Sequence, residues 1–502
     1  MKKKILAMSI AAGMSVFAGG ASAGMEINAN GVGYINILPY YSAQGDNVSM
    51  FSVTNTSTTT YKLAKVRFRG AEFSDDVFDF QLFLSPQDVY TFYVAKDAAT
   101  GQAKFYADDN SCTLPARDVL NGAPLSTQRL VGTADQKLAG TREGYVEIIS
   151  MADVSDPAVQ ATIKHSGHNG MTQSNALSKP ACTASILGSP TNAIDLTSSL
   201  AAPTGGLMSW GIVADLKSTK AFTMTATAIS PTAADIPVKA LYWRQADLQS
   251  DVYAGGPAVL DNTTITTYSA DNALALIPPY EFDLPDLSTP YNAATGTLNT
   301  PALQRNAVTA LFADKGTVVT EYVTDDGIAA STDVVLSQPT RRFYYTFTGS
   351  TALNPAVSGA SGIYANTDFS AARGGLTTVY TPAAYGREEQ AFNVGTPGGI
   401  VISPNVGAPD NPFYVRGEVS VVTINQGQTT KSESLGAQLT NVDYLFQGFA
   451  PADGWMKLNV QNKKAADANL PVIGFTAINM FNQGGNNGNG SNYGMTLPLR
   501  KM

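Results

Sequence analysis

Between residues 33 and 94, short apolar or alternating segments follow one another with turn signals between them. This pattern constrains the fold more than any other feature. The segments cover 33–41, 48–53, 61–69, 78–84 and 89–94. Alternation with a period of two over so few residues is typical of strands, and tight turns favour antiparallel neighbours. We therefore predict an all-β fold of antiparallel, β-sandwich-like sheets, with long loops and at most one or two short helices.

Segment 61–69 predicts a strand with one exposed face. Two sets of side chains alternate in part along it: Tyr61, Leu63, Val66 and Phe68 against Lys62, Lys65, Arg67 and Arg69. Neighbouring side chains of a strand point to opposite faces, so the cations are expected to lie on the half-exposed face.

The same patterns predict further strands and one helix. The strands are expected over 145–149, 211–213, 222–229, 238–243, 319–323, 342–347, 415–424, 455–460 and 472–480. Threonines alternate with apolar residues in 222–229, which suits an exposed β face. Asp156 is a good helix N-cap, Pro157 suits the first helical position and Gly167 could end the helix.

Two stretches are expected to form long surface loops rather than core. Residues 349 to about 411 are rich in Ala, Gly, Pro, Ser and Thr, and 483–492 is a Gly/Asn run. A change of composition near 230–236 suggests a boundary. We thus predict an N-terminal β-sandwich region over 24–230 and a C-terminal β-rich region over 231–502, or one intertwined domain of both.

The N-terminus has the three parts of a signal peptide in order. Lys2 to Lys4 give a positive start, 5–17 is apolar, and Ala21-Ser22-Ala23 fits a cleavage site. A mature chain that starts at Gly24 is expected outside the cell or at its surface, with the periplasm as the alternative. A buried N-terminal helix is the competing interpretation. No later apolar run reaches 18 residues, so no transmembrane segment is expected after cleavage.

The charge of the chain argues against a nucleic-acid partner. Loss of residues 1–23 removes three lysines and no acidic residue, which changes the formal net charge from −8 to −11. Such a surface repels nucleic acid and anionic lipid. Charged residues make up 14% of the chain and hydrophobic ones 44%. The chain can therefore bury a core, and its polarity is mostly uncharged, as in many extracellular β proteins.

The chain has two cysteines, Cys112 and Cys182. An even count in an exported protein predicts one disulfide between them, because oxidising compartments favour that state. Two free thiols are the alternative.

Histidine chemistry is limited, because His165 and His168 are the two histidines of the chain. A three-histidine zinc site is impossible, and neither HExxH nor G-x-S-x-G occurs. The pair lies where the short helix should end. Two histidines with a distant Asp could bind a metal, although a surface helix cap is the simpler interpretation.

Acidic pairs remain as candidates for catalysis or metal binding. Glu388 and Glu389 would point to opposite faces if extended, so they cannot share one glycosidase site. The calcium candidates are Asp75, Asp76, Asp108, Asp109, Asp325 and Asp326, with Asp79 close by in sequence. Calcium takes oxygen ligands from such loops, but none matches an EF-hand. Solvated turns are the alternative, and no other cofactor is expected.

Eight short phrases carry a resemblance to known sequences. They are Val53–Ser57, Lys65–Arg69, Asp79–Val89, Gly144–Glu147, Pro339–Phe343, Arg387–Glu389, Gly454–Trp455 and Pro471–Phe475. They resemble a loose group of secreted, β-rich bacterial proteins described as cell-surface or hypothetical proteins. The resemblance covers most of the mature chain, less so between 185 and 330. It implies export and β structure. That group has no established activity, so the resemblance assigns no catalytic residue.

These features favour a structural protein over an enzyme. We expect a surface-layer, matrix or fibre subunit, or an adhesin, that assembles with itself or binds cell-envelope components. A secreted glycan- or ligand-binding protein is the alternative, with Trp210, Trp243 or Trp455 on a sheet face. A secreted carbohydrate-active enzyme is the third hypothesis. An aromatic row on a sheet face would favour binding, whereas a deep cleft with two facing carboxylates would favour the enzyme.

Overall fold

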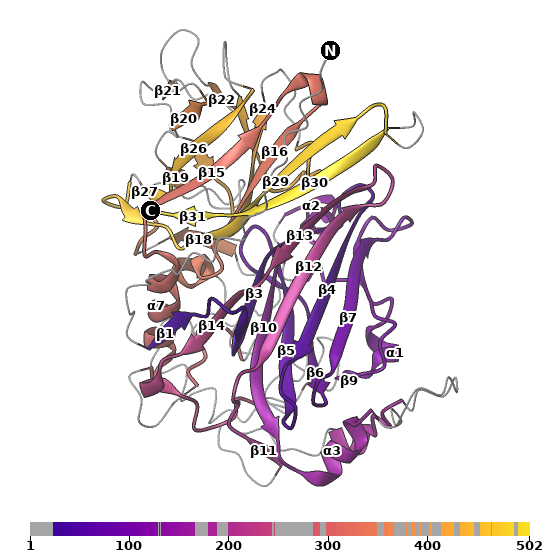
Figure 1. Ribbon diagram of the computed structural model, residues 1–502. Coiled ribbons are helices and arrows are strands. Elements are labelled where there is room, and N and C mark those ends of the chain that lie inside the picture. Colours follow the sequence, from indigo (N-terminus) through magenta and orange to yellow (C-terminus); the bar gives the residue numbers. More distant parts are fainter. Residues whose placement is uncertain are drawn as a thin grey trace.

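The computed structural model describes most of the chain from residue 24 onward (Figure 1). The described residues are 24–128, 130, 132–165, 179–187, 199–242, 245, 285–291, 298–348, 356–360, 362–365, 377–379, 383–387, 391–392, 401–403, 413–425, 432–445, 452–462, 464–485 and 490–502. The expected signal peptide lies outside them.

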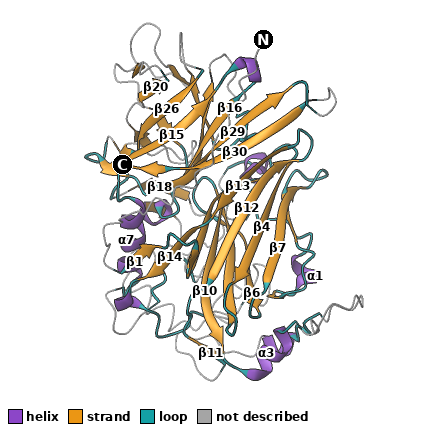
Figure 2. Cartoon of the chain, in the orientation of Figure 1, coloured by secondary structure: helices purple, strands orange, loops and turns teal. Residues whose placement is uncertain are grey.

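Two sheets of the N-terminal region form a sandwich (Figures 1 and 2). Sheet A has the order β1-β14-β3-β10-β5-β6-β9 with β11 beside β10, and sheet B the order β13-β12-β4-β7-β8 with β2 beside β12. The strands are β1 Met25–Ile27, β2 Val32–Gly33, β3 Ile35–Ser42, β4 Asn47–Asn55, β5 Tyr61–Gly70, β6 Asp76–Leu84, β7 Val89–Lys96, β8 Ala103–Tyr106, β9 Cys112–Leu114, β10 Glu143–Val154, β11 Leu200–Ala201, β12 Leu207–Asp215, β13 Lys220–Thr225 and β14 Thr227–Pro231. All their pairings are antiparallel, which confirms the predicted fold class.

Aromatic side chains fill the space between sheets A and B. Phe68 of β5 meets Phe51 of β4 and Phe92 of β7 edge to face, with ring centroids 5.7 and 6.0 Å apart. Phe78 of β6 stacks on Phe105 of β8 at 4.9 Å. Each such pair adds about 0.5–1.5 kcal/mol beyond the burial of its area. The interleaved rings therefore fix how the two sheets face each other.

Two larger sheets and two smaller ones form the C-terminal region. Sheet C has the order β21-β20-β26-β15-β31 and sheet D the order β22-β25-β24-β16-β29-β30; β23-β19-β27-β28 and β17-β18 are separate. The strands are β15 Thr317–Val323, β16 Ser331–Ser337, β17 Tyr345–Thr348, β18 Ala356–Ala360, β19 Thr377–Val379, β20 Ala383–Gly386, β21 Ala391–Phe392, β22 Val401–Ser403, β23 Phe413–Val415, β24 Val419–Asn425, β25 Asn441–Leu445, β26 Asp453–Asn459, β27 Gln461–Asn462, β28 Ala468–Asn469, β29 Ile473–Asn482, β30 Ser491–Pro498 and β31 Arg500–Lys501. Among the described strands, β24 and β25 form the one parallel pair.

Sheet D contributes one face to each of two hydrophobic cores. Val335 of β16 and Phe475 of β29 belong to the large core that also fills the sandwich of sheets A and B. Val334 and Leu336, the neighbours of Val335, belong to a second core with Met456 of sheet C. Alternate side chains of a strand point to opposite faces. Sheet D is therefore a wall shared by both cores, and the larger core draws on both sides of residue 230.

Five short α-helices occur in the described residues, compared with the one or two expected. They are α1 Arg117–Leu120, α2 Ala134–Gly140, α3 Pro157–Ile163, α4 Ala184–Leu187 and α7 Pro301–Phe312. The predicted helix is confirmed as α3, whose N-cap Asp156 accepts a hydrogen bond from the Ala158 amide. Gly167 lies outside the described residues. Helix α7 was missed although Thr300 caps it and Pro301 begins it.

Four strand predictions were wrong in part. The predicted strand 222–229 is divided between β13 of sheet B and β14 of sheet A. Residues 238–242 form no strand, and Trp243 lies outside the described residues. Arg341–Tyr344 form a 3₁₀ turn before β17 begins. The predicted strand 415–424 is divided between β23 and β24, because Gly417 turns the chain with a φ of +58°.

The two stretches that were expected to form long loops have different outcomes in the structure. Residues 349–411 contain the short strands β18 to β22, whereas the described part of 483–492 connects β29 to β30. Among the described helices, none has the length and apolar character that a membrane span needs.

Candidate functional site

Strand β5 is not half-exposed as predicted, because its cations point into a buried layer of carboxylates. The ion pairs are Lys62 with Asp153, Lys65 with Asp79, Arg67 with Asp76 and Asp79, and Arg69 with Glu147. All four cations are at most 4% exposed. Strand β5 lies between β6 and β10, whose acidic residues stand opposite the cations in register. Acidic residues on both neighbouring segments were the sequence signal that could have revealed this layer.

The first calcium candidates are part of this buried layer. Asp76 accepts from Arg67 Nε at 2.9 Å, and Asp79 accepts from Arg67 Nη2 at 3.2 Å. Asp75 is 2% exposed. The carboxylates of Asp76 and Asp79 thus serve guanidinium groups of the fold rather than an open loop.

The other four candidates lie in turns. Asp109 accepts from the amides of Thr91 and Ser111, at 3.0 and 2.9 Å. Asp325 accepts from the Gly327 amide at 2.8 Å, and Asp108 and Asp326 are exposed. Within the described ranges, no three His, Cys, Asp or Glu side chains are grouped as a metal site would need. The turn hydrogen bonds give Asp109 and Asp325 a local structural role.

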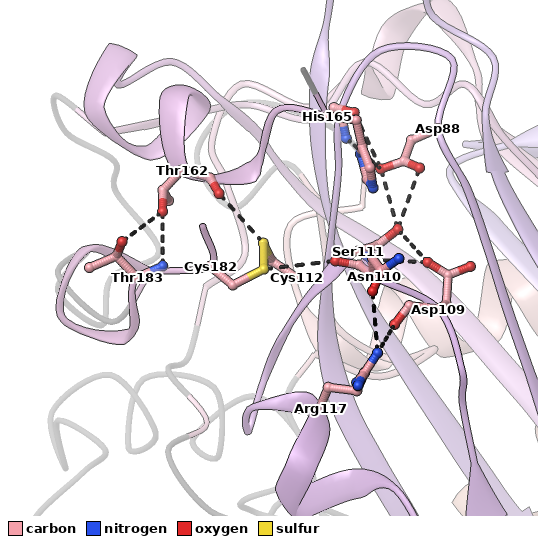
Figure 3. Close-up of a disulfide and its surroundings, with 11 residues drawn as sticks. Asp88, Asp109, Asn110, Ser111, Cys112, Arg117, Thr162, His165, Cys182 and Thr183 are labelled. Atoms are coloured by element: carbon pink, nitrogen blue, oxygen red, sulfur yellow. Dashed lines mark hydrogen bonds and ion pairs between the residues drawn. A yellow bond between two sulfur atoms is a disulfide. The ribbon is translucent and has the colours of Figure 1, made fainter. Parts of the chain in front are cut away.

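His165 lies in a small polar cluster near the disulfide (Figure 3). Its Nδ1 is 3.4 Å from Asp88 Oδ2 and 3.3 Å from Ser85 Oγ, and the ring is 38% exposed. Burial raises the pKa of Asp88, and the His165 ring together with the amides of Ser85 and Val89 opposes that rise. His168 lies outside the described residues.

This cluster does not have the arrangement of a catalytic triad. In a triad the carboxylate binds Nδ1 and the serine binds the opposite ring nitrogen, Nε2. Here Asp88 and Ser85 both contact Nδ1 of His165. The ring cannot accept a proton from Ser85 while Asp88 orients it through a second nitrogen, so the geometry offers no activated nucleophile.

The predicted disulfide is confirmed between Cys112 and Cys182 (Figure 3). It ties β9 to the chain between α3 and α4, 70 residues away. Thr162 of α3 fixes the backbone around Cys182, since its carbonyl accepts a hydrogen bond from the Cys182 amide and its hydroxyl accepts one from the Thr183 amide. The bond therefore anchors the helical segment to the edge of sheet A.

The tryptophan candidates lie on two different surfaces. Trp455 of β26 stacks on Tyr385 of β20, with ring centroids 4.3 Å apart. Trp210 of β12 is 42% exposed on the outer face of sheet B. Trp243, Glu388 and Glu389 lie outside the described residues.

The outer face of sheet B is an exposed surface with little charge. Its outward side chains are Val48, Met50, Ser52 and Thr54 of β4; Val89, Thr91, Tyr93 and Ala95 of β7; Met208, Trp210, Ile212 and Ala214 of β12; Ala221, Thr223 and Thr225 of β13; and Lys104 and Tyr106 of β8. Thr223 and Thr225 of the exposed Thr face predicted for 222–229 form part of it, whereas Thr227 belongs to β14 of sheet A. Tyr93 and Tyr106 stack at 4.9 Å, and Lys104, the one charged member of this set, pairs with Asp97.

Other segments cover both edges of sheet B. The Phe105 amide of β8 donates to Ala123, and the Leu125 amide donates back to Ala103. On the opposite side β30 lies so close to β13 that a Cβ added at Gly494 would be 2.1 Å from the Ala221 carbonyl oxygen. Addition of a foreign strand is therefore disfavoured at these edges, and the broad face is what sheet B offers to a partner.

Comparisons with known proteins give no match to a family model, to a curated protein or to a solved structure.

Proposed function

We propose that this chain is an exported cell-surface structural protein that assembles with copies of itself through the outer face of sheet B. The observation that carries the proposal is the exposed, nearly uncharged apolar face of an acidic protein. Val89, Met208, Trp210 and Tyr93 are each between 37% and 43% exposed there. Large apolar patches of this kind mark interaction sites on soluble proteins.

The charge of the chain limits where a second copy can bind. A mature chain with a formal net charge of −11 repels its own copies over most of its surface. Lys104 on the outer face of sheet B is neutralised by Asp97, so two copies can meet at this face with little repulsion. Screening of the remaining charge by salt should strengthen the contact.

The size of the face is sufficient for a specific contact. Five strands spaced ~4.8 Å apart, with about seven residues of ~3.3 Å along each, give roughly 550 Å². Two copies would bury about 1,100 Å², slightly more than the ~1,000 Å² expected of a specific interface. The threonine hydroxyls along β13 add hydrogen-bonding groups at the rim.

Sedimentation velocity and electron microscopy of the mature protein, starting at Gly24, test this proposal. We expect concentration-dependent association that salt strengthens. Trp210→Asp and Tyr93→Asp each place a carboxylate in the face and should weaken association at least tenfold. Ile236→Asp is the matched control, because Ile236 is 51% exposed but lies outside sheet B. A wild-type protein that stays monomeric at every concentration and salt level would refute the proposal.

A further inference from the structure

A groove lies on the outward face of sheet C, away from the second core. It has a volume of about 740 Å³. The lining residues come from β15, β20, β26, the end of β30 and the start of β31, and include Glu321, Tyr385, Arg387, Trp455, Pro498 and Arg500. A volume of this size is within the ~300–1,000 Å³ range of small-molecule sites.

The strand register of sheet C sets the positions of the aromatic stack, Glu321 and Arg500. Trp455 is opposite Tyr385 on one side and opposite Glu321 on the other. Arg500 of β31 is opposite Val319, one alternating position along β15 from Glu321. The backbone of β31 is therefore about 10 Å, two strand spacings, from that of β26. The groove therefore has room for an occupant of more than one sugar ring between β26 and β31.

The charges of the groove differ from those of the whole chain. Two guanidinium groups, Arg387 and Arg500, and one carboxylate, Glu321, line it, whereas the chain is acidic. Arg387 pairs with Asp453, and Arg500 is exposed with no ion pair in the part of the chain that the structure describes. A planar guanidinium at an open site suits bidentate contact with a carboxylate.

We infer that this groove binds an acidic oligosaccharide, with a sugar ring packed against the Tyr385–Trp455 stack and a uronate carboxylate on Arg500. The C–H groups of a pyranose carry partial positive charge and are attracted to the negative faces of aromatic rings. Glu321, on the strand between the stack and Arg500, can accept hydrogen bonds from sugar hydroxyls.

The site is built for binding rather than for hydrolysis. A glycosidase needs two carboxyl groups on either side of the scissile bond. Glu321 is the one carboxylate among the described lining residues, and Asp453 at the edge is paired with Arg387. The groove is separate from the outer face of sheet B, so the two proposals can fail independently.

Isothermal titration calorimetry of the mature protein with trigalacturonate, and with maltotriose as a neutral probe of equal length, tests the inference. We expect trigalacturonate to bind at least tenfold more tightly than maltotriose, and salt to weaken its binding. Trp455→Ala and Arg500→Ala should each reduce affinity at least tenfold. Arg500→Lys should recover part of the affinity, because it keeps the charge and loses the bidentate geometry.

Tyr493→Ala is the matched control, since it removes an exposed aromatic side chain that lies outside both the groove and the outer face of sheet B, and it should leave saccharide affinity unchanged. Thermal unfolding of each variant checks that the fold is retained. Absence of binding, equal binding of both probes, or a loss caused by Tyr493→Ala instead of Trp455→Ala would overturn the inference. Shortening of the uronate during incubation would overturn the binding role.

Discussion

Several buried carboxylates hold distant segments together through their hydrogen bonds. Glu143 of β10 accepts from the amides of Gln438, Leu439 and Thr440, at 2.8, 3.0 and 3.1 Å. Nearly three hundred residues separate the two segments. Charge-assisted bonds of this kind are about twice as strong as neutral ones. The link between N- and C-terminal regions therefore rests on single side chains as well as on the shared core.

The Arg69–Glu147 pair should be costly to break from one side. Arg69→Met leaves a buried carboxylate without its guanidinium, and we expect a loss of about 3–5 kcal/mol in the free energy of unfolding. The double variant Arg69→Met, Glu147→Leu removes both charges and should recover most of that loss. Urea denaturation measures both; a double variant as unstable as the single one would contradict this account.

Glu418 should make stability depend on pH. It is fully buried, and neither carboxylate oxygen has a hydrogen-bond partner among the described residues. Burial raises its pKa well above the usual value, although Arg341 opposes the rise. The folded state thus favours the protonated form. The contribution of Glu418 is fully present below its unfolded pKa and is lost as pH rises toward the folded pKa.

Glu418→Gln mimics the protonated side chain and should remove this dependence. We expect the variant to be about as stable as wild type near pH 4 and progressively more stable as pH rises to 8. Urea midpoints across that range give the measurement. Parallel pH profiles for the two proteins would show that Glu418 does not titrate in this way.

At the scale of elements, sequence periodicity located most strands of the sandwich but not their exposure. Segments such as 48–53 and 78–84 became β4 and β6 because turn residues bound them clearly. The surroundings of β5 could not be predicted, since burial of Lys65 and Arg67 depends on Asp79 arriving from β6 in register. The groove could not be predicted either, because it also depends on strand pairing. Tyr385 and Trp455 are seventy positions apart in sequence, and the pairing of β20 with β26 brings them together.

Gly417, between β23 and β24, offers a test of element packing. A Cβ there would lie 2.3 Å from the Ala71 carbonyl oxygen. Gly417→Ala should therefore cost more than the ~1–2 kcal/mol of left-handed backbone strain. Gly45→Ala is the matched control, because Gly45 has the same φ of +58° with open space around it. Equal losses of stability for the two variants, measured by urea denaturation, would argue against the Ala71 contact.

At the scale of the whole molecule, the Cys112–Cys182 disulfide closes a long covalent loop. The sequence separation is 70 residues, for which the chain-entropy model gives about 4 kcal/mol of stabilisation. Replacement of both Cys112 and Cys182 by Ser should reduce the free energy of unfolding by about that amount. The same drop should appear in wild type after reduction. Unchanged stability in the double variant would contradict the expectation.

The shared wall formed by sheet D also limits how the gene can vary. A one-residue insertion inside β16 would exchange the faces of Val334 and Val335 and so misplace side chains in two cores at once. An insertion in the turn between β29 and β30 would shift no core residue. We expect length changes to be tolerated between β29 and β30 and rejected in β16, so that variants of different chain length differ at the edge of sheet D and not within it.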